Sequence, residues 1–256
     1  MNSEFWINEL TGQEMENMMI LSNLLKGKDP LRQVHEDIAP NTIVITYDYG
    51  IEKRGNFYSM DTFGNIEAIS RWFYENQVQV ETTYDQMVMI FDALGKKSFP
   101  SRYYLMRYVC SLPVALKGTL EMEKVNPLPD YDKLLMEGLK DAKKYSQREI
   151  KVLFDNETFQ EDMKEGIYIF KKEGVPMGYA MIKYTTRKYA EISNLWVKRE
   201  FRSKGYSNEM LKMIIRELKQ LNLCALVTLK NDNFGLIRLF EQENFELKAI
   251  MSREKL

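Results

Sequence analysis

The sequence predicts an α/β protein: a mixed, largely antiparallel sheet with flanking helices, preceded by a small α+β region. Short runs of β-branched and aromatic residues alternate with amphipathic stretches along the chain, which is typical of this class. The clearest amphipathic stretch is Tyr206–Leu221, and its apolar residues fall on one helical face at Met210, Leu211, Ile214, Ile215, Leu218 and Leu221. Turn residues separate the runs, as between Gly166–Lys171 and Pro176–Tyr184, where a glycine lies in the expected hairpin loop.

The first part of the chain mixes helical and extended patterns. In chain order we expect a helix, a strand with its hairpin partner, two helices and a strand, over residues 9–25, Thr42–Tyr49, Gly55–Met60, Asn65–Glu75, Gln86–Leu94 and Arg102–Cys110. The aromatic residues of this part are expected in its core.

A second series of predicted helices and strands begins near residue 116, with the expected order β-α-α-β-β-β-α-β-α-β. Its elements are expected at Gly118–Lys124, Tyr131–Tyr145, residues 156–164, Gly166–Lys171, Pro176–Tyr184, Ala190–Val197, Tyr206–Leu221, Cys224–Leu229, Asn233–Gln242 and Phe245–Met251. With a boundary within Ser111–Lys117, the sequence divides into a domain of residues 1–115 and one of residues 116–256.

The overall composition is that of a soluble globular protein. The 256 residues are 45% hydrophobic and 29% charged, with a formal net charge of −1. Because no excess of positive charge is present, we expect no nucleic-acid partner. No apolar run approaches a membrane span of about 20 residues, so we expect no membrane association.

The numbers of cysteines and histidines restrict the kinds of site and mechanism that the chain can have. Cys110 and Cys224 lie in apolar runs, which predicts buried thiols in a reducing compartment. His35 is the one histidine of the chain, so a mechanism or metal site that needs several imidazoles is excluded. The N-terminus has no basic region followed by an apolar core. We therefore expect a cytoplasmic protein without a metal.

A candidate anion site follows the strand that ends at Val197. The segment Leu195–Lys212 reads as a strand, a short basic turn with one glycine and the start of a helix. Backbone N–H groups and the positive end of a helix dipole converge at such a point, which favours phosphate. Gly205 permits close approach of the backbone, Arg202 and Lys204 add positive charge, and hydroxyls come from Ser203 and Ser207. Taken alone, the turn is better explained as an ordinary helix start with solvated basic residues.

The residues downstream of this turn make its interpretation more specific. Asn233 opens a second helix that carries Phe240, and the turn Asn244-Phe245 follows. The combined pattern over residues 116–256 resembles the GNAT superfamily of N-acetyltransferases. The resemblance implies that the turn, from Arg202 to Ser207 and including Tyr206, wraps the pyrophosphate of acetyl-CoA.

The resemblance also implies roles for backbone groups. Leu195, Trp196 and Val197 are expected to pair with the pantetheine arm like an added strand, with the Val197 N–H as the donor to the developing oxyanion. Asn233 is expected to cap its helix and to contact the CoA arm. Residues 195–197 are also expected as core strand residues and Asn233 as a helix cap. These structural roles are compatible with contacts to the cofactor.

This chain departs from the family pattern at three positions. Ser207 and Asn244 replace small residues, and both substitutions keep the local backbone feasible. Phe240 stands where the family has a tyrosine that often protonates the leaving thiolate. A CoA thiol has a pKa near ~8.5, like that of cysteine, so departure without an acid is feasible.

Glu191 is the expected general base, acting directly or through water, as the family often has a glutamate on this strand. Odd-numbered residues from Glu191 to Val197 are expected on one strand face, which would turn Glu191 toward the cleft. The alternative is a surface glutamate paired with Lys183 or Lys188. Nearby tyrosines, at positions 179, 184 and 189, are candidates for the missing acid or for the acceptor pocket.

The expected function is transfer of an acetyl group from acetyl-CoA to a primary amine of a small molecule or peptide, by direct attack in a ternary complex. One alternative is a catalytically weak CoA-binding regulatory or scaffold protein, because of Phe240. Another is a nucleotide site, against which the missing lysine-serine pair of the P-loop counts. Residues 1–115 have three open roles: a degenerate second GNAT-like half, a lid that selects the acceptor, or a surface that forms a homodimer.

Overall fold

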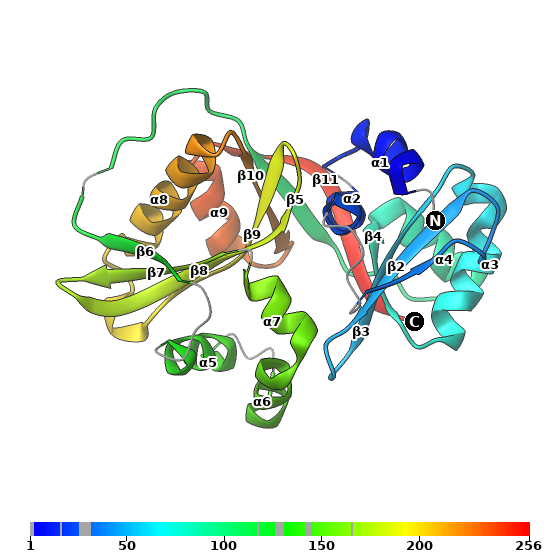
Figure 1. Ribbon diagram of the computed structural model, residues 1–256, viewed down its shortest axis with the longest axis horizontal. Coiled ribbons are helices and arrows are strands. Elements are labelled where there is room, and N and C mark those ends of the chain that lie inside the picture. Colours follow the sequence, from blue (N-terminus) through cyan, green and yellow to red (C-terminus); the bar gives the residue numbers. More distant parts are fainter. Residues whose placement is uncertain are drawn as a thin grey trace. The chain divides into compact units, whose positions relative to one another are not determined.

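The computed structural model describes residues 3–15, 17–25, 32–116, 118–125, 131–141, 145–164 and 166–256. The chain forms two compact units. The first comprises Met1–Leu105, Leu229–Asp232 and Leu247–Leu256, and the second comprises Met106–Thr228 and Asn233–Glu246. Figure 1 traces the elements of both. Lys117, within the expected boundary segment, lies outside the described residues, and the division into functional domains at residues 115 and 116 stays a prediction.

The first unit is built on a mixed sheet with helices on both faces. Its strands follow the order β1-β2-β3-β4-β11, with β3 and β4 parallel and the other neighbours antiparallel. The elements are α1 (Ser3–Thr11), α2 (Met18–Leu25), β1 (Arg32–His35), β2 (Thr42–Asp48), β3 (Lys53–Ser59), α3 (Thr62–Glu75), β4 (Gln79–Thr83), α4 (Tyr84–Ala93), the start of β5 (Tyr103–Tyr108) and most of β11 (Phe245–Lys255), which begins in the second unit.

The alternation of side chains along β2 gives this unit two cores. Ile43 and Ile45 face one side, where they pack against α1 and α2. Val44 faces the other side and packs against α3 and α4 through residues such as Phe73 and Met87. The run of β-branched residues that predicted this strand therefore reflects burial on both faces.

Two predictions for this unit are corrected by the structure. Residues 9–25 are two helices rather than one, because the chain leaves the helical path between Thr11 and Met18, where Gly12 has the poorest helix propensity of any residue but proline. The strands β1 and β4 were not predicted. Their sequences, RQVH and QVETT, are short and polar and carry little of the β-branched pattern.

The second unit contains a sheet in the order β10-β9-β8-β7-β6. The strands β6 to β9 are antiparallel neighbours, and β10 is parallel to β9. The elements are β6 (Glu121–Val125), α5 (Asp132–Asp141), α6 (Gln147–Asp155), α7 (Glu157–Lys164), β7 (Ile167–Lys172), β8 (Val175–Thr185), β9 (Tyr189–Val197), a 3-10 turn (Arg199–Phe201), α8 (Tyr206–Gln220), β10 (Cys224–Lys230), α9 (Phe234–Gln242) and β11 (Phe245–Lys255).

The mixed sheet confirms the predicted fold class, while the helices before β7 differ from the prediction. Between β6 and β7 the described residues form three helices instead of two, because α6 was missed. Ser146 and Glu149 form a capping box at its start, so an S-x-x-E signature could have revealed it. The expected helix Tyr131–Tyr145 ends at Asp141, and residues 142–144 lie outside the described residues.

The chain repeats one order of elements. The series β2, β3, α3, β4, α4, β5 recurs as β8, β9, α8, β10, α9, β11. In each series an antiparallel hairpin is followed by a helix and then by a strand that pairs in parallel with the second hairpin strand. Each parallel pairing is brief: it covers Arg54 and Gly55 of β3, and residues 189–191 of β9. Each unit thus has two parallel strands whose pairing stops partway along their length.

Candidate functional site

The candidate site lies at the carboxyl ends of β9 and β10 in the second unit. Pairing between these strands ends at Leu226 and Glu191, and each strand continues for several residues beyond. Because the strands are parallel, the turn after Val197 and the residue Asn233 after β10 lie at the same edge of the sheet. Ligands of open α/β sheets bind at such edges.

The end of β9 presents backbone N–H groups away from β8. Lys198 donates its N–H to the carbonyl of Met177 at 2.8 Å, and Val197 is the register partner of Gly178. N–H groups of successive residues in a strand point to opposite edges. The N–H groups of Val197 and Leu195 therefore point toward the edge beyond the pairing with β10. A ligand with an extended amide arm can pair there as an added strand, as predicted for Leu195, Trp196 and Val197.

The turn into α8 has the backbone shape of an anion site. Ser203 and Gly205 have left-handed φ angles of 60° and 80°. Gly205 is the N-cap of α8, and it provides no side-chain hydrogen bond to the first turn. The N–H groups of Asn208 and Glu209 bond to the Gly205 carbonyl at 3.2 and 3.3 Å, which leaves the earlier N–H groups without a capping side chain.

These features fit the diphosphate of CoA. No atom lies within 4 Å of the position that a Cβ on Gly205 would occupy, so the backbone there is open to a ligand. The structure places Tyr206 and Ser207 as the first two residues of α8, and the N-cap is Gly205 rather than Ser203 or Ser207. Asn233 does cap α9, since its side chain accepts from the Leu236 N–H at 3.4 Å, as predicted.

Asp141, at the end of α5, accepts hydrogen bonds from the end of β9 and from the residues that follow it. Its carboxylate accepts from the Trp196 indole N–H at 3.0 Å and from Nε and Nη2 of Arg199 at 3.0 and 2.6 Å. Arg202 also donates to it through Nη2. Donation by Arg202, Trp196 and Arg199 holds the pKa of the Asp141 carboxyl well below its usual range. Four donors from three residues of the strand and turn thus meet at one carboxylate.

The basic residues of the turn donate hydrogen bonds to nearby backbone carbonyls. Arg202 donates from Nε to the Val197 carbonyl at 2.8 Å, in addition to its contact with Asp141. Lys204 donates to the Glu200 carbonyl at 2.8 Å. Lys172 donates to the hydroxyl of Tyr206 and lies 5.1 Å from the centre of its ring. Direct contact of Arg202 and Lys204 with phosphate stays a prediction.

A β-bulge changes the expected orientation of Glu191. The β8–β9 register pairs Met181 with Asn194 and Ile182 with Ile192, which leaves Ser193 as the extra residue. Side chains beyond the bulge are thereby shifted by one position. The face of Glu191 is shared with Asn194 and Trp196 rather than with Leu195 and Val197. The prediction that odd-numbered residues from 191 to 197 share one face was therefore wrong.

Glu191 is also distant from Val197 along the strand. The six-residue separation spans about 20 Å at ~3.3 Å per residue. Glu191 lies at the last pair with β10, whereas Val197 lies next to the anion turn. The structure brings residues 195–207 and Asn233 to one edge of the sheet and places Glu191 farther back along the strand.

The aromatic candidates are core residues. Phe240 is 1% exposed and contacts Phe245 edge to face, with ring centroids 4.9 Å apart. Tyr179 is buried against Trp196, and burial raises its pKa. Tyr184 is buried as well and has a positive φ of 55°. Tyr189 is half-buried at the start of β9.

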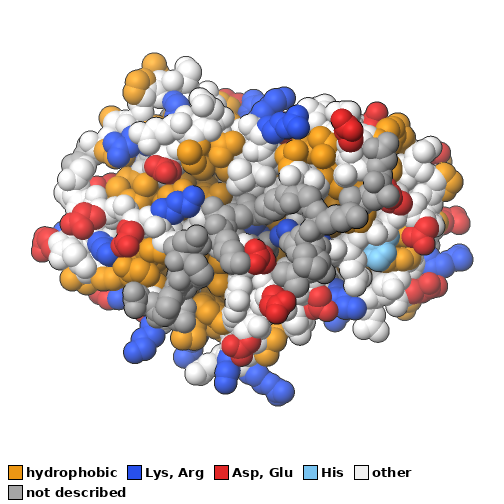
Figure 2. Space-filling view, in the orientation of Figure 1, with side chains coloured by type: hydrophobic (Ala, Val, Ile, Leu, Met, Phe, Trp, Pro, Cys, Tyr) orange, Lys and Arg blue, Asp and Glu red, His pale blue; other side chains and the backbone are white. Residues whose placement is uncertain are grey.

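Asp141 is the residue of the site that the sequence did not reveal. It ends a helix 55 positions before Trp196, and nothing in its local pattern distinguishes it from a solvated carboxylate. Among the described residues, no group of three or more His, Cys, Asp or Glu side chains could hold a metal ion. No helix within the described part is long and apolar enough to cross a membrane. Basic and acidic side chains are interspersed on the face drawn in Figure 2.

The second unit contains residues that match a family of acetyltransferases. Residues 132–245 match the family model described as the Acetyltransferase (GNAT) family, and they form a domain of that family. A comparison with curated proteins finds no match.

Solved structures share the fold over most of the chain. A GCN5-related N-acetyltransferase from Kribbella flavida is 14% identical, with a TM-score of 0.62 over 92% of this chain and 93% of that one. A GCN5-related N-acetyltransferase from Sphaerobacter thermophilus is 13% identical, with a TM-score of 0.56 over 92% of this chain and 84% of that one. A tandem GNAT protein from the clavulanic acid biosynthesis pathway is 10% identical, with a TM-score of 0.58 over 93% and 87%.

Proposed function

We propose that this protein transfers an acetyl group from acetyl-CoA to a primary amine by direct attack in a ternary complex. The observation that carries the proposal is the combination of an uncapped α8 start, left-handed Ser203 and Gly205, and the outward N–H groups at the end of β9. Backbone groups that bind a diphosphate and an amide arm in this order suit CoA rather than a free nucleotide.

Each part of the edge has a separate task in this scheme. The anion turn holds the diphosphate, and the N–H groups of Leu195 and Val197 pair with the arm. One of these N–H groups also donates to the thioester carbonyl, whose oxygen gains negative charge as the amine attacks. The backbone performs all these tasks. It is paired with β8 and is hydrogen-bonded to Asp141 through the Trp196 side chain.

Glu191 receives the amine proton in this proposal through ordered water. Its position at the last β9–β10 pair is too far from Val197 for direct contact with an amine held there. Because each hydrogen bond spans about 2.8 Å, the distance of ~20 Å requires a chain of several waters. Replacing Glu191 by Gln should lower kcat and shift its pH dependence while the KM for acetyl-CoA stays unchanged. If kcat is unchanged, solvent accepts the proton.

A second candidate function rests on Phe240, which supplies no proton and is buried at 1% exposure. In this second function the protein binds CoA in a regulatory or scaffold role and has little turnover. Thiol release from acetyl-CoA with a panel of primary amines separates the two functions. Release that depends on one amine class supports the transferase, while CoA binding without release for any amine supports the binding protein.

Binding of the cofactor is tested by thermal shift with CoA, pantetheine and ATP. CoA should raise Tm more than pantetheine, which lacks the diphosphate, and ATP should have little effect. Gly205→Val places a branched side chain at a left-handed position in the turn and should abolish the difference between CoA and pantetheine. Gly174→Val, at another left-handed position with open space around it and between β7 and β8, is the matched control. Stabilisation by ATP and not by CoA would refute the proposal.

A further inference from the structure

A polar cavity of about 240 Å³ lies within the first unit, separate from the acyltransferase domain. At ~30 Å³ per molecule it has the volume of about eight waters, which suits a ligand on the order of ten non-hydrogen atoms. Most of its lining side chains are carboxamides and hydroxyls, from Gln13, Asn17, Asn56, Ser59, Thr62, Thr82, Thr83 and Gln86.

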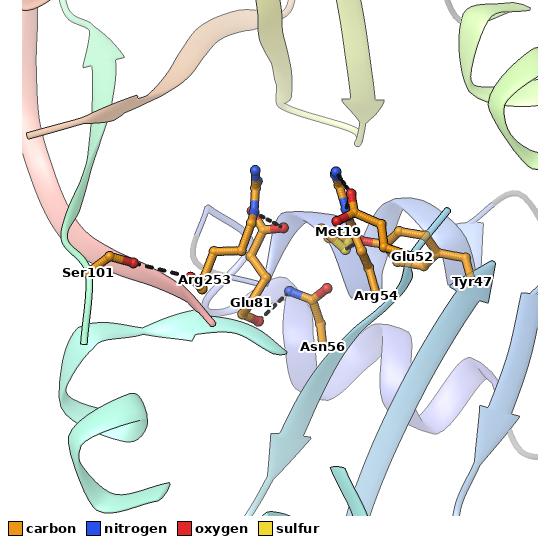
Figure 3. Close-up of polar contacts among 8 residues, drawn as sticks. All are labelled: Met19, Tyr47, Glu52, Arg54, Asn56, Glu81, Ser101 and Arg253. Atoms are coloured by element: carbon orange, nitrogen blue, oxygen red, sulfur yellow. Dashed lines mark hydrogen bonds and ion pairs between the residues drawn. The ribbon is translucent and has the colours of Figure 1, made fainter. Parts of the chain in front are cut away.

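The cavity occupies the place where β3 and β4 stop pairing. Their parallel register covers Arg54 with Gln79 and Gly55 with Val80. The next residues of each strand, from Asn56 and from Glu81 onward, line the cavity. At the point of separation the Asn56 side chain replaces the backbone ladder, since its Nδ2 donates to the Glu81 carbonyl at 2.7 Å. Figure 3 shows this amide directed at the Glu81 backbone.

The bond to Glu81 fixes which end of the Asn56 amide is available. Because Nδ2 is used as the donor, Oδ1 is left as a hydrogen-bond acceptor, and it has no partner among the described residues. Asn56 is only 8% exposed and is part of the cavity wall. A buried carbonyl oxygen without a partner is costly, so the site favours a molecule that donates an N–H or O–H group to it.

The charges around the cavity disfavour an ionic ligand. None of the described residues that line it is Lys, Arg or His, so an anion finds no counter-ion. The one carboxylate among the described lining residues is that of Glu81, which already accepts from Nε and Nη2 of Arg253 at 3.1 and 2.6 Å. A cation would therefore compete with a bidentate arginine pair (Figure 3).

The cavity is also unsuited to CoA, although the chain order around it repeats that of the acyltransferase site. Between β3 and α3 there are only Met60 and Asp61, with no glycine turn. Asp61 accepts from the Gly64 N–H at 2.9 Å, so a carboxylate already caps this helix where a diphosphate would lie. Negative charge at this end repels phosphate.

We propose that this cavity binds a small uncharged polyhydroxyl molecule, of the size of a monosaccharide or a cyclic polyol, which donates an O–H hydrogen bond to Asn56 Oδ1. Hydroxyl groups both donate and accept, so they match a wall of carboxamides and hydroxyls. The first unit then supplies a sensing or recognition site that works independently of CoA.

The test uses the full chain and a fixed panel: glucose, galactose, mannose, N-acetylglucosamine and myo-inositol, each by calorimetry and by thermal shift without CoA. At least one is expected to bind and to raise Tm. The charged counterparts glucosamine and gluconate should bind at least tenfold more weakly than the best neutral probe. Absence of binding by the whole panel, or stronger binding of glucosamine or gluconate, would overturn the proposal.

Three variants locate the binding. Asn56→Leu removes the acceptor and should reduce affinity at least tenfold. Met60→Trp should block the cavity without affecting folding, since Met60 lines the cavity yet is 49% exposed. Asn76→Leu removes an amide contact of the same unit, to the Trp72 carbonyl at 2.8 Å, and neither residue lines the cavity, so this control should leave binding intact. Unchanged affinity in Met60→Trp would place the ligand elsewhere, even if Asn56→Leu fails to fold.

Discussion

The indole N–H of Trp196 donates to the carboxylate of Asp141 at 3.0 Å, joining the end of β9 to the end of α5. Arg199 and Arg202 reach the same carboxylate. Asp141→Asn removes the charge that these donors share, so we expect Tm to fall by about 2–4 °C, which corresponds to ~1 kcal/mol for a chain of this size. Thermal denaturation at neutral pH measures the change.

Asp232→Asn is the matched control for that substitution. Asp232 pairs with Lys230, and their side chains are 60% and 54% exposed, so its loss should shift Tm by less than about 1 °C. The pH dependence adds a second check. Because the folded pKa of Asp141 is lowered, its stabilisation is present above the unfolded pKa and is lost as the pH falls below about 4. A wild type as insensitive to acid as Asp141→Asn would contradict the assigned role.

The left-handed Gly205 gives a second prediction. Gly205→Ala forces a Cβ into φ 80° and should cost about 1–2 kcal/mol, although there is space for the methyl group. Gly235→Ala, inside α9 at a normal helical angle, should instead stabilise by up to ~1 kcal/mol. Urea denaturation of both variants provides the measurement. Equal effects of the two substitutions would mean that the backbone of the turn is not strained.

A third prediction concerns the residue that replaces the family's tyrosine. Phe240→Tyr places a hydroxyl in a core position that is 1% exposed, so we expect destabilisation by about 1–3 kcal/mol. Phe234→Tyr on the same helix, at 76% exposure, should be neutral. Thiol release is measured in parallel. Increased release by Phe240→Tyr with undiminished stability would show that this side chain can reach the reacting atoms, contrary to its position in the core.

His35 provides a pH-dependent prediction in the first unit. The imidazole lies 4.7 Å from the ring of Trp72 and contacts the Thr46 hydroxyl at 3.3 Å, and burial lowers its pKa despite Asp37. The folded state then binds the proton less readily than the unfolded state, so stability should decrease as the pH falls below about 6.5. As the one histidine in the chain, its NMR signal gives the midpoint directly. A midpoint above 6.5, or the same pH dependence in His35→Gln, would contradict this.

The sequence predicted the acyltransferase fold because its signals are local. A glycine turn between a strand and an amphipathic helix and an Asn that opens the next helix are fixed by neighbouring residues. The bulge at Ser193 and the position of Asp141 depend on the partner strand and on a helix far away in the chain, so no local pattern contains them. The acceptor role of Asn56 likewise arises only where β4 leaves β3, and β4 itself is too polar to be predicted as a strand.

The last strand has a consequence for how the chain is made. β11 begins in the second unit, yet Met251–Lys255 pair with β4 of the first, where Arg253 binds Glu81. Synthesis runs from the N-terminus, so the unit that leaves the ribosome first is the last to be completed. Until Met251–Lys255 have been synthesised, β4 lacks its antiparallel neighbour β11 and the Glu81 carboxylate lacks the Arg253 guanidinium. Deleting Met251–Lys255 therefore removes a strand from the sheet of the first unit.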